Sequence, residues 1–273
     1  MKFTKMQGAG NDFIIIDNRA GIIARQNYSR ISERLCSRRL SLGADGIMFI
    51  EAPSGGGCFK MVFYNNDGTE GEMCGNGARC ISRWGYERGL SDGSVVRVET
   101  ASGTVVGERR SERQYTVRLN SPSVIDLHRE VLGLDVSYVE LGIPGHPHCV
   151  VPYSGLAEAD REELSKLGSS LRWYKGFPKG ANVTFCEVTG ENEVRALTFE
   201  RGVENFTLAC GTGSGSTALA LRLRGLVSGN DTKITVPGGD LFVTVSPENG
   251  GWGIYLTGPT TMVAEGEILD EDL

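Results

Sequence analysis

The amino-acid sequence predicts an α+β protein of two similar domains, each a curved sheet around one central helix. Three observations predict this fold class. Two Cys-Gly-x-Gly segments, at 74–77 and 210–213, are separated by half the length of a chain of 273 residues. Each follows a segment that alternates like a β-strand and precedes a segment of helical composition. Alternating strand–helix units, which would favour a doubly wound sheet, are missing from the sequence pattern.

The internal repeat extends beyond these two segments. Residues 74–90 and 210–226 are identical at six of 17 positions without a gap, where composition alone gives about one identity. Upstream, 61–63 falls opposite 197–199 at the same offset. We therefore expect two pseudo-symmetric halves. Each residue of the first half should correspond to a residue of the second half at the sequence separation that joins position 74 to position 210.

Helices are expected where helical composition ends at a glycine. In the repeat these segments are 78–88 and 214–224, each followed by a glycine (Gly89 and Gly225) that stops the helix. Two further helices are expected at 28–40 and 157–167.

Strands are expected where apolar and polar residues alternate or β-branched residues cluster. The expected strands are 59–64, 95–99, 115–119, 195–200, 233–236, 241–245 and 253–256, with a further strand around Val105. Turn residues at 120–123 suggest the domain boundary, with its counterpart at 257–260. The domains are then 1–120 and 121–261, and the tail 262–273 is expected to return to the first domain.

Composition and charge exclude several classes of protein. Hydrophobic residues make up 40% and charged residues 23%, as in ordinary globular proteins. The net charge of −6 does not suit a phosphate backbone, so nucleic acid is not an expected partner. No segment reaches the roughly 18 apolar residues of a membrane span, and Gly8 to Asp12 interrupt any signal-peptide core. Seven cysteines, an odd number without a CxxC pair, disfavour a disulfide framework, and we expect a cytoplasmic protein.

The paired cysteines carry the chemistry that the sequence predicts. Cys74 and Cys210 each stand at or just before a helix N-terminus, where unpaired N–H groups and the helix dipole lower a thiol pKa from about 8.5. The adjacent glycines let a ligand approach the backbone, whose N–H groups can hold a carboxylate. An α-amino acid in the cleft between the halves would then have one sulfur on each face of its α-carbon. That geometry is typical of a two-base racemase, in which one thiolate removes the α-proton and the opposite thiol supplies another.

Three other interpretations stay open at this point. Gly211-x-Gly213-x-Gly215 comes close to a dinucleotide-binding fingerprint but breaks its pattern. His146-Pro147-His148-Cys149 is a short ligand-like run, although three histidines in total make a zinc site weak and we expect no metal. The two thiols could also form a non-enzymatic redox switch or binding module.

Several short segments, in order along the chain, resemble those of diaminopimelate epimerases. They are Gly8-Ala9-Gly10-Asn11-Asp12-Phe13, Asn65-Asn66-Asp67-Gly68, Cys74-Gly75-Asn76-Gly77-Ala78-Arg79-Cys80, Asn182-Val183, Glu200-Arg201-Gly202-Val203 and Ala209-Cys210-Gly211-Thr212-Gly213. The resemblance covers nearly the whole chain. It implies two pseudo-symmetric domains, each a curved, mainly antiparallel sheet wrapped around a central helix, and a homodimer without cofactor. The implied activity is an isomerase that interconverts LL- and meso-diaminopimelate, independently of pyridoxal phosphate, on the route to lysine and a peptidoglycan precursor.

The resemblance also implies roles for individual residues. Cys74 and Cys210 match the two bases. The backbone amides that match the cradle for the reacting carboxylate are those of Gly75, Asn76, Gly211 and Thr212. The matching substrate-binding positions are Asn11, Asn65, Asn182, Glu200 and Arg201, and His148 and Glu200 match the positions that tune the thiols.

Three positions depart from the common pattern of the family. Gly46 follows Asp45 where a glutamine is common, and His146 precedes Pro147 where an asparagine is common. The segment 205–207 is Asn-Phe-Thr, with Phe206 at its centre, where Gly-Glu-Thr is common. These departures leave the two-thiol chemistry intact but leave the distal specificity open, so a related cofactor-independent racemase for another amino acid is the alternative.

The repeat makes one further prediction about specificity. At the constant offset of the repeat, Asn65 falls opposite Arg201 and Tyr64 opposite Glu200. Matched residues suit the chemistry at the α-carbon, so unmatched residues must recognise the rest of the substrate. We expect the guanidinium of Arg201 to bind the distal carboxylate in a bidentate contact.

Overall fold

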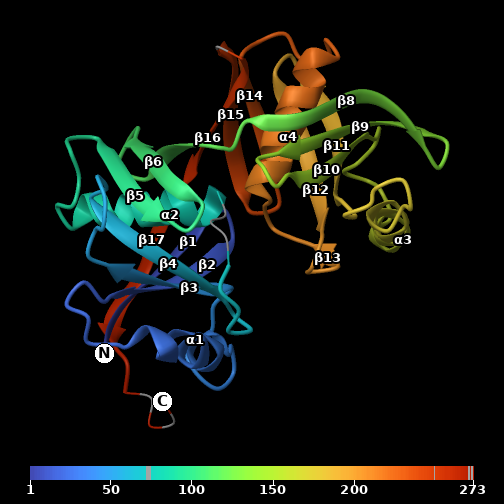
Figure 1. The fold of residues 1–273 in the computed structure, drawn as a ribbon. Helices are drawn as coiled ribbons and strands as arrows, with labels where there is room; N and C mark the ends of the chain where they lie inside the picture. Colours follow the sequence, from blue (N-terminus) through green and yellow to red (C-terminus); the bar gives the residue numbers. More distant parts are fainter. Residues whose placement is uncertain (72–74, 249, 270, 272) are drawn as a thin grey trace. The chain divides into compact units, whose positions relative to one another are not determined.

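A computed structural model describes the chain except for residues 72–74, 249, 270 and 272, and divides it into two compact units (Figure 1). Unit 1 contains Met1–Val117 and Gly258–Leu273, and unit 2 contains Arg118–Thr257. Cys74 lies outside the described residues. Among the helices that are described, none combines the length and apolar character needed to cross a bilayer.

Unit 1 is a mixed, mainly antiparallel sheet that encloses one helix. Its strands are β1 (Lys2–Gly8), β2 (Asn11–Asp17), β3 (Gly46–Glu51), β4 (Phe59–Asn65), β5 (Val95–Thr100), β6 (Gly103–Arg109), β7 (Gln114–Arg118) and β17 (Thr261–Glu267). Its helices are the short 3₁₀ helix η1 (Arg25–Asn27), α1 (Tyr28–Cys36) and α2 (Gly75–Glu87). The pairs β2–β3 and β4–β5 are parallel, and the C-terminal β17 pairs antiparallel with β1.

The helices α1 and α2 cover opposite faces of the strands of unit 1. The buried face of α2, including Ile81 and Trp84, packs in one core with Phe59 of β4 and Val98 of β5. The helix α1 packs in a second core on the other side of β2, β3 and β4, where Tyr28 stacks on Phe49 with ring centroids 3.8 Å apart. Alternate residues of one strand therefore supply two separate cores.

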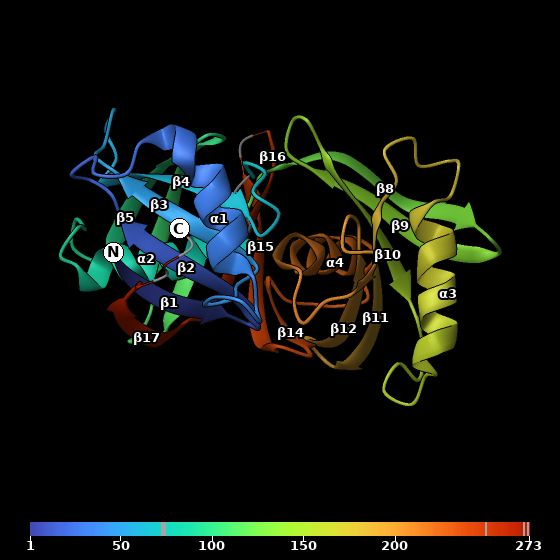
Figure 2. The same cartoon turned by 90° about the horizontal axis from the view of Figure 1, so that it is seen from below.

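Unit 2 repeats this arrangement. Its strands are β8 (Pro122–Val131), β9 (Leu134–Leu141), β10 (His146–Pro152), β11 (Asn182–Gly190), β12 (Glu193–Glu200), β13 (Asn205–Phe206), β14 (Asp231–Val236), β15 (Gly239–Glu248) and β16 (Gly251–Pro259). Its helices are α3 (Arg161–Arg172) and α4 (Gly211–Leu223). Strands surround the buried helix α4, whereas α3 lies on the outside of the sheet (Figure 2).

The helix boundaries correct several sequence expectations. The helices α2 and α4 begin at Gly75 and Gly211, before the expected starts at 78 and 214. The expected helix at 28–40 ends at Cys36. The expected helix at 157–167 was misplaced, because α3 begins at Arg161 and ends at Arg172. Its start is fixed by Asp160, whose carboxylate accepts N–H groups of Glu162 at 2.8 Å and Glu163 at 3.0 Å.

The constant repeat offset is wrong for β4 and β12. In unit 1, Phe59 of β4 pairs with Val98 of β5, and in unit 2, Val194 of β12 pairs with Ile234 of β14. The step from Val98 to Ile234 equals the step from Cys74 to Cys210, but the step from Phe59 to Val194 is shorter by a single position. The strand β4 therefore corresponds to β12 with this shorter offset, and Asn65 corresponds to Glu200 rather than Arg201.

The slip of a single position arises in the turn that follows each strand. In unit 1, the N–H of Gly68 donates to the carbonyl of Asn65 at 3.1 Å, which closes a four-residue turn. In unit 2, the N–H of Glu204 donates to the carbonyl of Glu200 at 2.8 Å, which closes a five-residue turn. Arg201 thus lies in the longer turn, directly after the strand end.

The close contact between α2 and its sheet generates a stability prediction. A Cβ atom on Gly85 of α2 would lie 2.5 Å from Cε1 of Phe59 and 3.1 Å from Cγ1 of Val96. Gly85→Ala should lower the free energy of unfolding in urea by about 1–2 kcal/mol, because overpacking outweighs the gain in helix propensity of about 1 kcal/mol. Gly56→Ala is the control, since no heavy atom lies within 4 Å of its Cβ position. Equal unfolding midpoints for the two variants would contradict the proposed packing.

Candidate functional site

The sulfur of Cys210 caps the N-terminus of α4. Cys210 has extended backbone geometry (φ −117°, ψ 108°), and its Sγ accepts the N–H of Gly213 at 3.3 Å. The hydroxyl of Thr212 lies 3.6 Å from the same sulfur. The side chain occupies the place that serine, threonine or aspartate oxygens take at ordinary helix N-termini. The thiolate form gains most from this place, because backbone N–H groups and the helix dipole both favour negative charge there.

Gly213 leaves room for this cap. A Cβ atom at this residue would lie 3.2 Å from the sulfur of Cys210 and 3.0 Å from Oγ1 of Thr184 on β11. The Thr184 hydroxyl is in turn hydrogen bonded to the Thr198 hydroxyl of β12 at 2.9 Å. The first turn of α4 therefore lies directly on a buried polar patch of the sheet.

His148 lies further along the sheet face that carries Thr184. In the parallel pair of β10 and β11, Val150 is opposite Thr184 and His148 is opposite Asn182. Residues two apart on a strand share a face, so His148 and Asn182 lie on the same side as Thr184. The imidazole of His148 is fully buried, and neither ring nitrogen has a hydrogen-bond partner among the described residues. Such buried unpaired atoms are rare, which makes this ring a candidate for a functional contact.

Burial determines the charge state of His148. It lowers the pKa of the imidazole to about 3, with smaller contributions from the charges of His146 and Arg201. His148 is therefore neutral at pH 7, with one ring nitrogen able to donate and the other able to accept a hydrogen bond.

Asn182, Glu200 and Arg201 come together at the ends of β11 and β12. Val183 pairs with Phe199, so Asn182 and Glu200 occupy the next position of the ladder. Oδ1 of Asn182 accepts the backbone N–H of Arg201 at 2.8 Å, and its Nδ2 lies 3.4 Å from the carbonyl of Pro147. The Asn182 side chain thus links the strand that carries His148 to the turn that carries Arg201.

The guanidinium of Arg201 is held by a second group of residues. It donates to the carbonyl of Lys179 at 3.0 Å, and the Lys179 ammonium forms an ion pair with Glu140 at 2.8 Å. The Tyr138 hydroxyl donates to the other oxygen of Glu140 at 2.6 Å. Burial would raise the pKa of Glu140, but hydrogen bonds from Lys179 and Tyr138 and the charge of Arg201 hold it below its ordinary value. Glu140 is therefore a carboxylate that balances two cations.

Four of the predicted site residues, Asn11, Asn65, Gly75 and Asn76, lie in unit 1. Asn11 is the first residue of β2, Asn65 is the last residue of β4, and Gly75 and Asn76 open α2. Nδ2 of Asn76 donates to Oδ1 of Asn11 at 2.6 Å, whereas Nδ2 of Asn65 donates to Thr69 at 3.0 Å. The predicted base Cys74 precedes this helix but lies outside the described residues.

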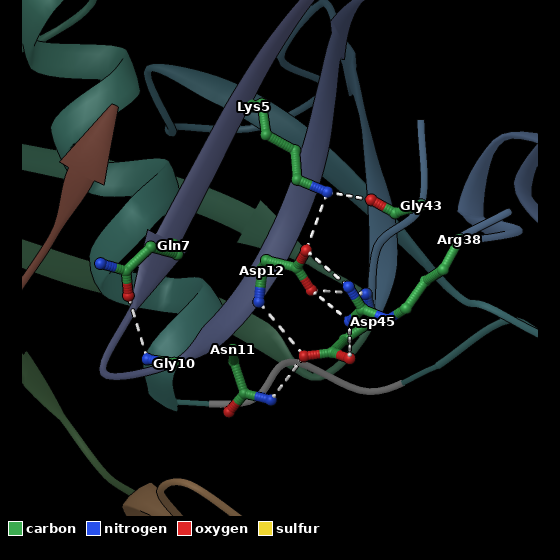
Figure 3. A network of polar contacts seen from close by, with 8 residues as sticks. All are labelled: Lys5, Gln7, Gly10, Asn11, Asp12, Arg38, Gly43 and Asp45. Carbon is green, nitrogen blue, oxygen red and sulfur yellow. Dashed lines mark hydrogen bonds and ion pairs between the residues drawn. The ribbon is translucent and has the colours of Figure 1, made fainter. Parts of the chain in front are cut away.

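A charged network adjoins Asn11 (Figure 3). Asp12 forms ion pairs with Lys5 at 2.8 Å and Arg38 at 2.7 Å, and Arg38 also pairs with Asp45 at 2.7 Å. Burial would raise the pKa of Asp12, but the hydrogen bonds and charges of Arg38 and Lys5 lower it to about 2. Oδ2 of Asp45 accepts Nδ2 of Asn11 at 3.1 Å.

The corresponding positions of the two units differ in polarity. The strand pairings place Phe13, Gly46, Phe63 and Asn65 of unit 1 where unit 2 has His148, Asn182, Thr198 and Glu200. In unit 1, Phe13 and Phe63 contact edge to face with ring centroids 6.2 Å apart. A Cβ atom on Gly46 would overlap the Phe63 ring, so this ring takes the space of a larger residue at 46. At two of these positions the sheet of unit 1 is therefore apolar, with Phe13 and Phe63, where the sheet of unit 2 is polar, with His148 and Thr198.

The remaining described cysteines differ from Cys210. All six described cysteines are free thiols. Burial raises the pKa of Cys36, Cys149 and Cys186 to about 12, as expected for small apolar residues of the core. No three His, Cys, Asp or Glu side chains of the described part gather as they would around a metal ion, and the run 146–149 forms no such group.

Three contributors to the site were missed from the sequence. Glu140 could have been found as the acid within the buried part of β9, where an unpaired charge is costly. Asp45 follows a turn and was recognised only as part of a motif. Lys179 carries no sequence signal, because its contact with Arg201 uses a backbone carbonyl.

Solved structures place the chain in a class of folds. A phenazine biosynthesis protein of the PhzF family from Bacillus anthracis superposes with a TM-score of 0.75 at 15% identity, covering 98% of this chain and 99% of that chain. A probable proline racemase from Agrobacterium radiobacter K84 superposes with a TM-score of 0.66 at 14% identity, covering 98% and 92% of the chains. The chain therefore has the α+β fold that these proteins share, and the predicted fold class is confirmed.

Sequence comparison then identifies the family. The sequence profile described as diaminopimelate epimerase matches residues 3–125 and 143–263. The diaminopimelate epimerase of Aquifex aeolicus is 35% identical over 100% of this chain and 99% of its own length. That of a Hydrogenobaculum species is 36% identical over 98% of each chain. The chain belongs to the diaminopimelate epimerase family, as the sequence resemblance predicted.

The buried imidazole of His148 generates a prediction for the dependence of stability on pH. The unfolded state binds a proton below a pKa of about 6.5 and the folded state below about 3, so stability falls as the pH falls from 6.5 towards 3. Between pH 7 and pH 5 this group should remove about 2 kcal/mol from the free energy of unfolding. His148→Phe should remove that loss, since a phenylalanine occupies the corresponding position in unit 1. Urea titrations of both proteins at the two pH values test this, and parallel losses would show that His148 is not held neutral.

Proposed function

We propose that the chain is a cofactor-independent epimerase that interconverts LL- and meso-diaminopimelate with Cys74 and Cys210 as its two bases. The observation that carries the proposal is the sulfur of Cys210 at the N-terminus of α4, in a chain of the diaminopimelate epimerase family. The curated relatives with that name are 33–36% identical over nearly their full length. The likeness to a proline racemase is one of fold alone, so the comparisons favour diaminopimelate over another amino acid.

The chemistry begins with a thiolate. One thiolate takes the α-proton of the substrate, and the other thiol gives its proton to the opposite face of the α-carbon, so the configuration inverts. The carbanion is stabilised as an enediolate, whose negative charge needs donors already in place. The backbone N–H groups at the starts of α2 and α4, at Gly75, Asn76, Gly211 and Thr212, are proposed to supply them.

His148 and Glu200 are proposed to tune the two thiols. A neutral imidazole can donate to a thiolate or accept from a thiol, and the ring of His148 has its nitrogens uncommitted to described residues. Glu200 is positioned opposite Asn182 and is proposed to bind the substrate amino group, whose positive charge suits a carboxylate.

The distal half of the substrate is assigned to asparagines and Arg201. Asn11, Asn65 and Asn182 are proposed to bind the distal polar groups, and Arg201 the distal carboxylate. The longer turn after β12 supports this assignment, because it adds a cation directly after the strand end that unit 1 lacks. The length of this turn, rather than a constant repeat offset, distinguishes Arg201 from the residues of unit 1.

Single cysteine variants test the two-thiol mechanism. Cys74→Ala and Cys210→Ala should each abolish inversion of LL-diaminopimelate, because each removes the acid or base for one face. The measurement follows α-hydrogen exchange in deuterated water with reductant present, together with the ratio of the two isomers. Cys58→Ala is the control, since Cys58 is a half-buried thiol outside the proposed site. Inversion that survives in either variant would exclude the mechanism.

A conservative substitution tests recognition of the distal carboxylate. Arg201→Lys should lower kcat/KM for diaminopimelate about tenfold to hundredfold, because a lysine cannot form the two parallel hydrogen bonds of a guanidinium. The pH profile of thiol alkylation should remain unchanged. Arg195→Lys on the preceding strand β12 is the control, since Arg195 pairs with Glu187 outside the proposed site. Equal activity of Arg201→Lys and the wild type would refute the assignment.

The assembly and location of the protein are part of this proposal. We propose a cytoplasmic homodimer that acts without pyridoxal phosphate, and the support is the family to which the chain belongs. Light scattering of the purified protein tests the dimer, and activity after exhaustive treatment with a carbonyl reagent tests independence from the cofactor.

A further inference from the structure

The side chains around Asn11 form a hydrogen-bond chain with one direction. A guanidinium nitrogen of Arg79, which is fully buried, donates to Oδ1 of Asn76 at 2.9 Å. Nδ2 of Asn76 donates to Oδ1 of Asn11 at 2.6 Å. Nδ2 of Asn11 donates to Oδ2 of Asp45 at 3.1 Å, where the chain ends (Figure 3). Every donor therefore points from Arg79 towards Asp45.

The two ends of this chain fix its direction. A guanidinium has donors alone, and an ionised carboxylate has acceptors alone. The amides between them could each turn over by half a rotation if isolated, because their oxygen and nitrogen ends have the same shape. With Asp45 at one end, Asn11 must present Nδ2 to it and Oδ1 to Asn76. The described contacts of the Asn11 side chain leave one hydrogen of its Nδ2 and one lone pair of its Oδ1 for a ligand.

Asp45 is itself fixed by its other contacts. Its Oδ1 accepts from Arg38 at 2.7 Å, and its Oδ2 also accepts the backbone N–H of Asp12 at 3.2 Å. Its own N–H donates to Oδ1 of Asp12 at 3.0 Å. Both carboxylate oxygens are thus committed, and the oxygen that faces Asn11 cannot rotate away without breaking contacts to two other residues.

We infer that Asp45 is a positioning residue that orients the Asn11 amide, and through it Asn76, for substrate. The inference rests on the proposed function, in which both asparagines contact diaminopimelate. Asp45 acts through Asn11 rather than on the reacting atoms. Because the hydrogen-bond chain passes through Asn76 in the first turn of α2, the same contact also orders the segment whose N–H groups are proposed to hold the reacting carboxylate.

An isosteric substitution tests the inference. In Asp45→Asn, the new amide keeps its oxygen towards Arg38 and presents N–H groups to Nδ2 of Asn11, so Asn11 turns over and loses its bond from Asn76. The kcat/KM for diaminopimelate should fall about tenfold or more, as for loss of a hydrogen bond to a charged group. In an Asn11→Ala background the same substitution should change kcat/KM less than about threefold, because the two residues act as one unit.

Asp12→Asn is the matched control. Asp12 has more ion pairs than Asp45, and no described hydrogen bond joins its carboxylate to the side chain of Asn11. This variant should lower the thermal midpoint at least as much as Asp45→Asn while it keeps kcat/KM within about threefold of the wild type. A larger loss of kcat/KM in Asp12→Asn would mean that the network acts through stability alone and would overturn the inference.

A readout without substrate separates this inference from the proposed function. The side-chain ¹H–¹⁵N resonances of Asn11, assigned by their loss in Asn11→Ala, should shift in Asp45→Asn and stay in place in Asp12→Asn. Unmoved resonances in Asp45→Asn would overturn the inference even if the enzyme epimerises diaminopimelate. If the Asn11 resonances shift in Asp45→Asn but the wild-type protein does not epimerise diaminopimelate, the positioning role stands and the proposed function is refuted.

Discussion

The hydrogen bond from the Gly213 N–H to the Cys210 sulfur is the interaction on which the rest of unit 2 depends. It requires a helix that begins at Gly211, a residue without a Cβ at 213, and extended backbone geometry at Cys210. A hydroxyl or carboxylate would cap the helix better, so a sulfur here serves reactivity more than stability. The buried polar residues below it, Thr184 and Thr198, are tolerated because they are hydrogen bonded to each other.

The two units have similar backbones but different side chains, and we assign these two features to different parts of the proposed function. The proposed mechanism uses the same helix start twice, once for each face of the α-carbon, and each of the two similar units contains such a helix start. Recognising an extended substrate asks for unlike surroundings, and the units differ in two ways. One turn is a residue longer, which puts Arg201 after Glu200, and Phe13 and Phe63 stand where unit 2 has His148 and Thr198. A one-residue insertion in a turn achieves this difference without disturbing the helices, because turns tolerate length changes better than packed elements do.

The repeat predicted the two similar halves and their principal helices because glycines and cysteines at helix starts are local features. The start of α3 was missed because helical composition extends before Asp160, and the capping contact decided the boundary. The slip between β4 and β12 was missed because the offset of the helices was carried back across the turn, although the alternation favours the shorter offset, which places Lys60 opposite Arg195, and the strand pairing agrees with it. For the site, Cys210, Asn182 and Arg201 were found from motifs, and contacts join Asn182 to Arg201. The roles of Glu140 and Asp45 depend on partners that are distant along the chain, which no local pattern contains.

The same physical device orients an asparagine in each unit, with opposite polarity. In unit 1 a carboxylate acceptor faces the Nδ2 of Asn11, and in unit 2 a backbone donor faces the Oδ1 of Asn182. An asparagine offers both donors and acceptors, so alone it does not distinguish an ammonium from a carboxylate. A neighbour that fixes the orientation of the amide decides in advance whether its oxygen or its nitrogen faces the substrate. No free energy is then needed to rotate the amide when substrate binds. With the proposed roles of Asn11 and Asn182, specificity towards a substrate with two ammonium and two carboxylate groups depends on the residues that orient these asparagines as much as on the asparagines themselves.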